Sequence, residues 1–129
     1  MIKNKEFNHL NELKEYVKKL VSHERTRSYA HLILKLKEID LNNALFIIIS
    51  KSGTTVETIS IFKYISSLVN ISKNNCITIT ENDSALKKFS DSKELKSFDI
   101  PKNVGGRFSV LSNVGLVPLY LMGVNIEKL

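Results

Sequence analysis

The stretch from Phe46 to Thr58 constrains the fold of this chain more than any other. It begins with the unbroken apolar run FIII, which is typical of a strand buried on both faces of a parallel sheet. Small and hydroxylated residues follow, and the segment after them has apolar residues at helical spacing. The sequence therefore predicts a strand, a tight turn and a helix, with the turn lying at the N-terminus of the helix.

The turn Ser50–Thr55 contains the groups that an anion site needs. A helix N-terminus presents free backbone N–H groups and a partial positive charge, and phosphate is an anion well matched to both. Gly53 allows the backbone to approach a ligand closely, and Lys51 adds a cation. Hydroxyls that could donate to phosphate come from Ser50, Ser52, Thr55 and Thr58. The alternative is a plain strand-to-helix turn with capping hydroxyls. The nucleotide-binding motif G-x-x-x-x-G-K-[ST] is absent from the turn.

The start of the predicted helix also contains the pattern T-x-x-E. Thr54 and Glu57 have the spacing of a capping box, in which each side chain bonds the backbone N–H of the other residue. We therefore expect Glu57 to cap the helix rather than to act as a base.

Composition limits the classes of partner. The 129 residues suffice for one domain with one core, and 19 basic residues against 13 acidic ones give a net charge of +6. This excess is spread along the apparent helices, without an aromatic-rich basic stripe, so we expect solvated surfaces and no nucleic-acid partner. We also expect no signal peptide and no membrane partner, because the chain has no apolar run of the required length.

Cysteine and histidine usage points away from disulfides and metals. Cys76 is the only cysteine, so no internal disulfide can form, and a buried structural thiol in a reducing, cytoplasmic setting is expected. The three histidines, His9, His23 and His31, are spaced too far apart to pair on one helical turn. We expect no metal site.

Strands and helices alternate along the chain. The pattern predicts an amphipathic helix over 1–27 interrupted by a loop at 23–28, and a second helix ending near 40–43. Strands are predicted at 45–50, 76–80 and 97–100, and helices follow them at 56–69, from 83 onward, and at 109–122. We expect the last helix to be buried on most sides because it is nearly all apolar. Such alternation is typical of an α/β fold, here a three-layer sandwich around a short parallel sheet.

A second candidate site is the loop that precedes the last helix. Gly105 and Gly106 permit backbone geometries closed to other residues, and Arg107 follows them directly. In a parallel sheet this loop and Ser50–Thr55 should lie at the same edge, where ligands gather. Arg107 could there stabilise a developing oxyanion, although a surface arginine after a tight turn is the alternative. Glu81, after the second strand, could face the same cleft or the surface.

These two motifs together resemble the glucose-6-phosphate isomerase family. Phe46–Thr58 resembles the phosphate loop of sugar isomerase (SIS) domains, in the form S-K-S-G-T-T-x-E-T found in this family. Asn103–Gly115 is similar to the region that contains the family's G-G-R-[FY]-S signature. The SKSGTT motif also occurs in other SIS proteins, and the order and separation of the two motifs strengthen the resemblance.

The resemblance implies a role for each matching residue. Ser50, Lys51, Ser52, Thr55 and Thr58 match positions around the sugar phosphate. Gly106 and Arg107 match an active-site pair, with Arg107 as the catalytic group that stabilises a cis-enediolate. The implied reaction interconverts glucose 6-phosphate and fructose 6-phosphate in glycolysis and gluconeogenesis, without metal or other cofactor. Family enzymes act as cytosolic homodimers.

Several family features have no counterpart here. The family's upstream G-I-G-G-S loop is not found in residues 1–49, which contain no glycine. Its base, a glutamate in a Q-x-x-E context, lies downstream of Arg107 beyond the last residue of this sequence, as do its ring-opening histidine and its C-terminal lysine. General base catalysis typically contributes about 10²–10⁴-fold, so we expect this chain alone to be inactive or nearly so.

Three interpretations remain open from the sequence. The first is a fragment of an isomerase of this family, and the second is a non-catalytic SIS-type module that binds a sugar phosphate. The third is a sheet remnant that needs a partner chain. The implied fold is SIS-type and flavodoxin-like, and an incomplete first strand is left open. We assign 33–129 to a SIS-type sugar-phosphate-binding domain and leave the helical segment 1–32 unassigned.

Apolar surface predicts self-association. The stripe near residues 10–21 and the apolar final helix would leave much apolar area exposed around so small a sheet. We therefore expect a homodimer or another self-associated state.

Overall fold

The computed structural model describes residues 27–129, in two compact units that divide between Leu41 and Asn42. The first unit contributes helix α2 (Arg27–Leu36). The predicted end of the loop at 23–28 is therefore wrong, because α2 already begins at Arg27. The helix also ends at Leu36, before the predicted end at 40–43. The amphipathic helix and apolar stripe predicted within residues 1–26 lie outside the described residues.

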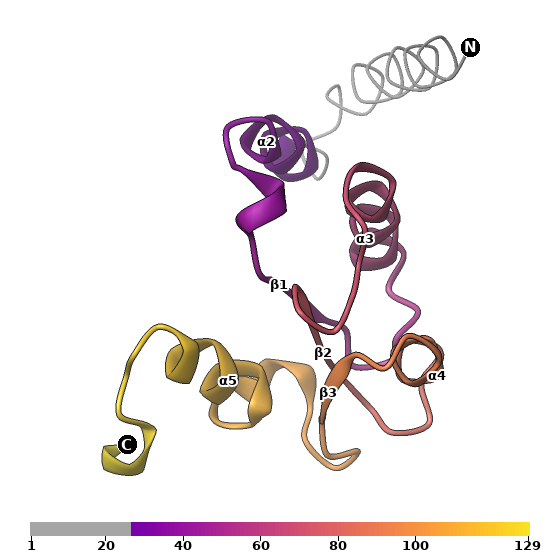
Figure 1. Cartoon of the computed structure of the whole chain (residues 1–129). Helices are drawn as coiled ribbons and strands as arrows, with labels where there is room; N and C mark the ends of the chain where they lie inside the picture. Colours follow the sequence, from indigo (N-terminus) through magenta and orange to yellow (C-terminus); the bar gives the residue numbers. More distant parts are fainter. Residues whose placement is uncertain (1–26) are drawn as a thin grey trace, which may run out of the picture. The chain divides into compact units, whose positions relative to one another are not determined.

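The second unit alternates strands and helices as predicted (Figure 1). After the short 3₁₀ helix η2 (Leu41–Asn43), its elements in chain order are β1 (Phe46–Ile49), α3 (Val56–Leu68), β2 (Cys76–Thr80), α4 (Ala85–Ser92), β3 (Lys96–Asp99), η3 (Gly106–Leu111), α5 (Asn113–Leu121) and η4 (Ile126–Lys128). All three predicted strands are confirmed, with ends that differ from the prediction by at most one residue.

The three strands form one parallel sheet in the order β1-β2-β3. Phe46 pairs with Cys76, and Ile77 pairs with Lys96, so the strands are nearly level at both ends. Consecutive parallel strands need a crossover, and right-handed crossovers in this order place the connecting helices on one face. Figure 1 shows α3 and α4 on the same side of the sheet.

The layer of α3 and α4 is held by apolar packing and by hydroxyl pairs. The Phe62 and Phe89 rings meet edge to face, with centroids 5.4 Å apart. Thr78 and Thr80 of β2 are fully buried, which is tolerated because each forms a hydrogen bond 2.7 Å long to a serine of the α4 region. The partner of Thr80 is Ser84, which also caps α4 by accepting from the Lys87 N–H.

Helix α5 forms the layer on the other face of the sheet. A groove of about 380 Å³ lies between them, lined by sheet residues such as Phe98 and by helix residues such as Leu116. The Asn113 amide donates to the Asp99 carbonyl at 2.7 Å and thereby fixes the start of α5 to the end of β3. The predicted three-layer α/β sandwich is confirmed, with a three-stranded parallel sheet at its centre.

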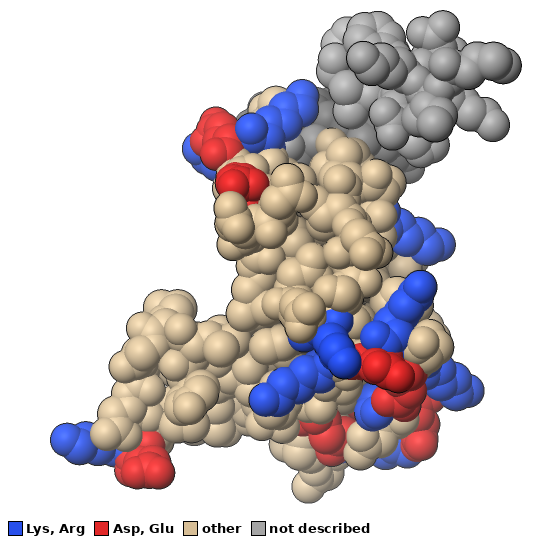
Figure 2. All heavy atoms as spheres, viewed as in Figure 1, with Lys and Arg blue, Asp and Glu red and all other residues tan. Residues whose placement is uncertain are grey.

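The final helix departs from its prediction in two respects. The segment 106–121 forms η3 and then α5, because the Ser112 side chain caps a new helix by accepting from the Val114 N–H. No residue of α5 is buried, since the sheet covers only one side of it. No charged residue occurs between Arg107 and Glu127, and Figure 2 shows the corresponding surface almost free of charge.

Cys76 is completely buried at the start of β2, as expected for a structural thiol. Burial raises the pKa of this thiol to about 11, so it is protonated at neutral pH. In the part of the chain that the structure describes, no helix has the length and apolar character needed to cross a membrane.

Candidate functional site

The candidate site lies where the three strands end. Parallel pairing with β2 continues for one residue past β1 and past β3: the Ser50 N–H donates to the Ile79 carbonyl at 3.1 Å, and the Ile100 N–H donates to the Thr80 carbonyl at 3.0 Å. The loop after each strand therefore begins at a fixed position on the same edge. This is the edge at which open α/β sheets bind ligands.

The loop Ser50–Thr55 makes a tight turn into α3. The Gly53 N–H donates to the Ser50 carbonyl at 3.2 Å, and the buried Ser50 hydroxyl donates to Thr55 Oγ1 at 3.0 Å. Ser52 is exposed, and its Oγ accepts from the Thr54 N–H and hydroxyl at 3.3 and 3.1 Å. Thr55 is also exposed, and Thr58 is half-buried in the first turn of α3. The loop thus gathers hydroxyls around a helix N-terminus.

The predicted capping box is wrong. The residue that caps α3 is Thr55, and its side chain makes no capping hydrogen bond. Thr54 instead bonds Ser52, so neither partner of the T-x-x-E pattern occupies the geometry that the box requires. The first backbone N–H groups of α3 consequently have no side-chain acceptor at the cap, and Glu57 lies exposed in the first turn.

Gly53 fits the loop against the N-terminus of α4. Its φ is +68°, in the left-handed region that favours glycine. A Cβ at this position would lie 2.8 Å from both the Leu86 backbone nitrogen and the Ser84 Cβ. A residue with a side chain would therefore be strained by its own backbone and would also clash with the backbone of α4.

Lys51 connects the two predicted loops. Its Nζ donates to the carbonyls of Lys102 and Val104, at 3.1 and 2.8 Å, and lies 3.5 Å from a carboxylate oxygen of Glu81. Glu81, for which the sequence left two positions open, faces Lys51, and its side chain is only 24% exposed. One ammonium group thus brings together the segments that follow all three strands.

The loop after β3 leads into η3 and presents Arg107. Gly106 and Arg107 are both exposed, and no hydrogen bond or ion pair forms between the Arg107 guanidinium and any other residue of 27–129. The Ser109 hydroxyl donates to the Gly106 carbonyl at 2.7 Å and shapes this turn. Arg107 therefore stands on a defined turn with its charge uncompensated by the described residues.

An exposed ion pair adds a second link at this edge. Lys102 donates a hydrogen bond to the Asp83 carboxylate. This hydrogen bond and the positive charge of Lys102 lower the pKa of Asp83, and the same partner raises the pKa of Lys102. Because both groups are in solvent, the pair contributes little to stability.

The structure brings the two motifs to one edge, but it also contains links that the sequence did not predict. Thr80 donates to the Lys51 carbonyl at 3.3 Å, and Asn113 anchors α5. The alternation of isoleucine and threonine in CITIT, followed by a serine at 84, could have indicated a polar network under the loop. No pattern in the sequence indicated that the Lys51 side chain would bond to carbonyls about fifty residues away.

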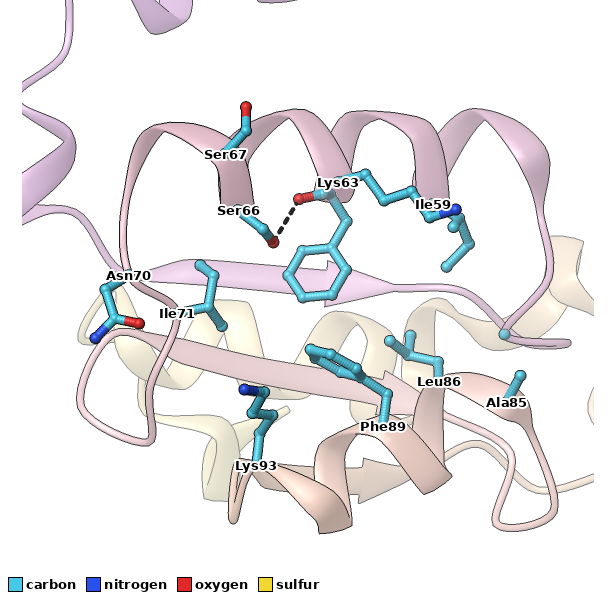
Figure 3. Close-up of a pocket in the computed structure, with 12 residues that line it drawn as sticks. Ile59, Lys63, Ser66, Ser67, Asn70, Ile71, Ala85, Leu86, Phe89 and Lys93 are labelled. Atoms are coloured by element: carbon cyan, nitrogen blue, oxygen red, sulfur yellow. Dashed lines mark hydrogen bonds between the residues drawn. The ribbon is translucent and has the colours of Figure 1, made fainter. Parts of the chain in front are cut away.

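A separate hollow lies between α3 and α4. It has a volume of about 550 Å³, and the ring of Phe89 and the side chain of Ile71 line it (Figure 3). Of the predicted site loops it touches only Gly53. It is a gap between two packed helices and not the predicted phosphate site. Over residues 27–129, no group of three or more His, Cys, Asp or Glu side chains forms a candidate metal site.

The fold and the site together define a layered α/β domain with a hydroxyl-rich loop and a glycine-arginine loop at the carboxyl edge of its sheet. The sequence model of the phosphoglucose isomerase family matches residues 11–128. The chain belongs to the phosphoglucose isomerase family.

Curated relatives agree with this assignment. The chain is 43% identical over 98 residues to a glucose-6-phosphate isomerase of Campylobacter jejuni, covering 73% of this chain and 24% of that protein. It is 43% identical over 97 residues to the enzyme of Methanocaldococcus jannaschii, with the same coverage of 73% and 24%. To the enzyme of Leptospira interrogans it is 40% identical over 114 residues, covering 82% of this chain and 24% of that protein.

A solved structure supports the fold. The chain superposes on a hypothetical protein from Thermus thermophilus with a TM-score of 0.63 and 35% identity. The match covers 73% of this chain and 24% of that one. The chain thus spans about a quarter of the length of the relatives and of the solved structure that it matches.

Replacement of Gly53 by alanine tests the packing of the loop. Gly53→Ala should lower the free energy of unfolding by at least about 1–2 kcal/mol, the cost of a left-handed backbone with a Cβ, and the clash with α4 adds to this cost. Gly106→Ala is the matched control, because a Cβ there meets nothing within 4 Å. Urea denaturation followed by circular dichroism measures both. Equal effects of the two substitutions would contradict the close approach.

Proposed function

We propose that this chain carries part of a glucose-6-phosphate isomerase active site, consisting of its phosphate-binding loop and a catalytic arginine. The observation that carries the proposal is the bridge from the Lys51 ammonium to the carbonyls of Lys102 and Val104, which places both motif loops at one edge. Membership of the phosphoglucose isomerase family supports it.

The proposed phosphate site is the turn at the start of α3. Its proposed ligands are the hydroxyl residues Ser50, Ser52, Thr55 and Thr58, and Lys51 is the turn residue between the first two of them. Exposed hydroxyls and first-turn N–H groups without a side-chain cap are suited to donate hydrogen bonds to the oxygens of a phosphate, and the helix dipole favours its charge. The buried bond from Ser50 to Thr55 keeps the turn in shape while leaving Ser52 open to solvent.

The proposed catalytic group is Arg107, with Gly106 providing the adjacent backbone. Isomerisation between an aldose and a ketose moves a proton between C1 and C2 and develops negative charge on the oxygens of an enediolate. A fixed cation near those oxygens stabilises that charge. The exposed Arg107 guanidinium, without an ion pair among the described residues, is available for this role.

We assign no residue of this chain as the base. Two acids near the edge already have cationic neighbours: Glu81 lies beside Lys51, and Asp83 pairs with Lys102. The chain therefore holds the sugar phosphate and stabilises charge without moving the proton. We propose 33–129 as the SIS-type domain, with 1–32 as a separate helical segment, and a cytoplasmic location as for the family enzymes.

Replacement of Ser52 tests the phosphate site. Ser52→Ala should weaken the binding of fructose 6-phosphate at least about tenfold, because a hydrogen bond to a charged group contributes about 1.5–3 kcal/mol. Ser60→Ala, at an exposed serine of α3, is the matched control and should leave the affinity unchanged. Isothermal titration calorimetry with fructose 6-phosphate and with 6-phosphogluconate measures both. No binding to the unsubstituted chain at millimolar ligand would overturn the phosphate site.

Activity separates binding from catalysis. The purified chain should show little or no isomerisation of fructose 6-phosphate in a coupled assay, because a general base, which typically contributes about 10²–10⁴-fold, is missing from the proposed half-site. The alternative function, a non-catalytic module that binds a sugar phosphate, predicts the same absence of activity together with tight binding of the sugar phosphate. Turnover by the purified chain would show that it contains a base and would refute this part of the proposal.

Apolar surface supports a further proposal of self-association. Leu111 and Met122 are 80% and 76% exposed, in a segment without charged residues. Sedimentation velocity at micromolar concentration should detect a dimer or larger species, and Leu111→Lys should weaken the association. The control Val56→Lys adds the same charge at a position that is 74% exposed on α3. A monomer at these concentrations would contradict self-association.

A further inference from the structure

We propose that the side chain of Lys51 is a positioning group and not a phosphate ligand: it clamps the loop that presents Arg107 to the phosphate-binding loop. This inference deepens the proposed function and rests on it for the identity of the ligand. The clamp itself is defined by contacts within the second unit.

The Lys51 ammonium is engaged by groups of the two neighbouring loops. An ammonium group has three protons and can donate three hydrogen bonds. Two go to the carbonyls of Lys102 and Val104, and a carboxylate oxygen of Glu81 lies 3.5 Å away as an ion-pair partner. A phosphate that bound the ammonium would compete with these partners for its protons and its charge.

Both ends of Lys51 are fixed. Its backbone carbonyl accepts from the Glu81 N–H at 3.1 Å and from the Thr80 hydroxyl at 3.3 Å, which are part of the second strand and the loop after it. Its side chain is 33% exposed, and burial of a charge is tolerated here because Glu81 lies beside it. The residue therefore links the ends of β1 and β2 to the loop after β3.

The two carbonyl acceptors lie just before the glycines that precede Arg107, so the clamp restricts the position of this arginine. Val104 directly precedes Gly105 and Gly106, which lose much conformational freedom when ordered. A hydrogen bond at Val104 fixes the start of this flexible pair and thereby limits where Arg107 can stand. The phosphate would then be held by hydroxyls and backbone N–H groups, with the lysine charge directed to the neighbouring loop.

Lysine side-chain NMR on the unsubstituted chain tests the clamp without a substitution. The ammonium protons of Lys51 should exchange with water at least about tenfold more slowly than those of Lys73, which is 66% exposed and lies just before β2. Equal exchange of the two ammonium groups would overturn the clamp.

Replacement by methionine tests its role in the site. In Lys51→Met, amide exchange over 103–107 should accelerate about tenfold. The affinity for inorganic phosphate, which needs only the first loop, should change less than about threefold. The affinity for 6-phosphogluconate, which in the proposed site contacts both loops, should fall about tenfold, equivalent to about 1.4 kcal/mol. Lys73→Met removes the same charge at the other edge and should change none of these.

The possible outcomes separate the clamp from the proposed function. If Lys51→Met lowers the affinity for inorganic phosphate tenfold or more and leaves amide exchange over 103–107 unchanged, the ammonium is a phosphate ligand and the clamp is refuted. If it behaves like Lys73→Met, the clamp is also refuted. If the unsubstituted chain binds neither ligand but loop exchange still accelerates in Lys51→Met, the clamp holds and the proposed function fails.

Discussion

Parallel pairing of β1, β2 and β3 is the constraint on which the rest of the structure depends. Because the strands run in one direction with nearly level ends, the loops after Ile49, Thr80 and Asp99 all begin at one edge. Segments about fifty residues apart in the sequence can then share a single ammonium group. An antiparallel arrangement would send alternate loops to opposite ends of the sheet and would separate the two motifs.

The same edge shows how polar groups can specify a loop. Buried threonines on β2 would destabilise the sheet if they lacked partners, but α4 supplies a serine to each of them. Thr80 and Ser84 then form the surface on which the turn at Gly53 rests. The proposed phosphate-binding loop thus packs on the hydroxyl residues of β2 and α4, and the Lys51 hydrogen bonds connect it to the loop after β3.

The sequence predicted what depends on local pattern. The FIII run and the polar turn after it are each encoded within a few residues, and the predictions of the strands and the layered fold rest on such local patterns. The capping box failed because Thr54 bonded Ser52, a competition between equally short side chains that spacing cannot resolve. The prediction that the last helix is buried on most sides was wrong. An apolar sequence indicates that a helix is stabilised by burial, but it does not show that the described residues supply the surface that buries it. The Lys51 bridge depends on tertiary placement and has no local signature.

A crystal structure of the chain with bound 6-phosphogluconate tests the central claim most directly, namely that the two motif loops form one sugar-phosphate site. The account predicts the phosphate at the N-terminus of α3, within hydrogen-bonding distance of Ser52, and the opposite end of the ligand toward Arg107. Lys51 should remain on the Lys102 and Val104 carbonyls. A ligand bound in the hollow between α3 and α4 would contradict the account, as would a ligand bound at the Ser50–Thr55 loop with its other end away from Arg107.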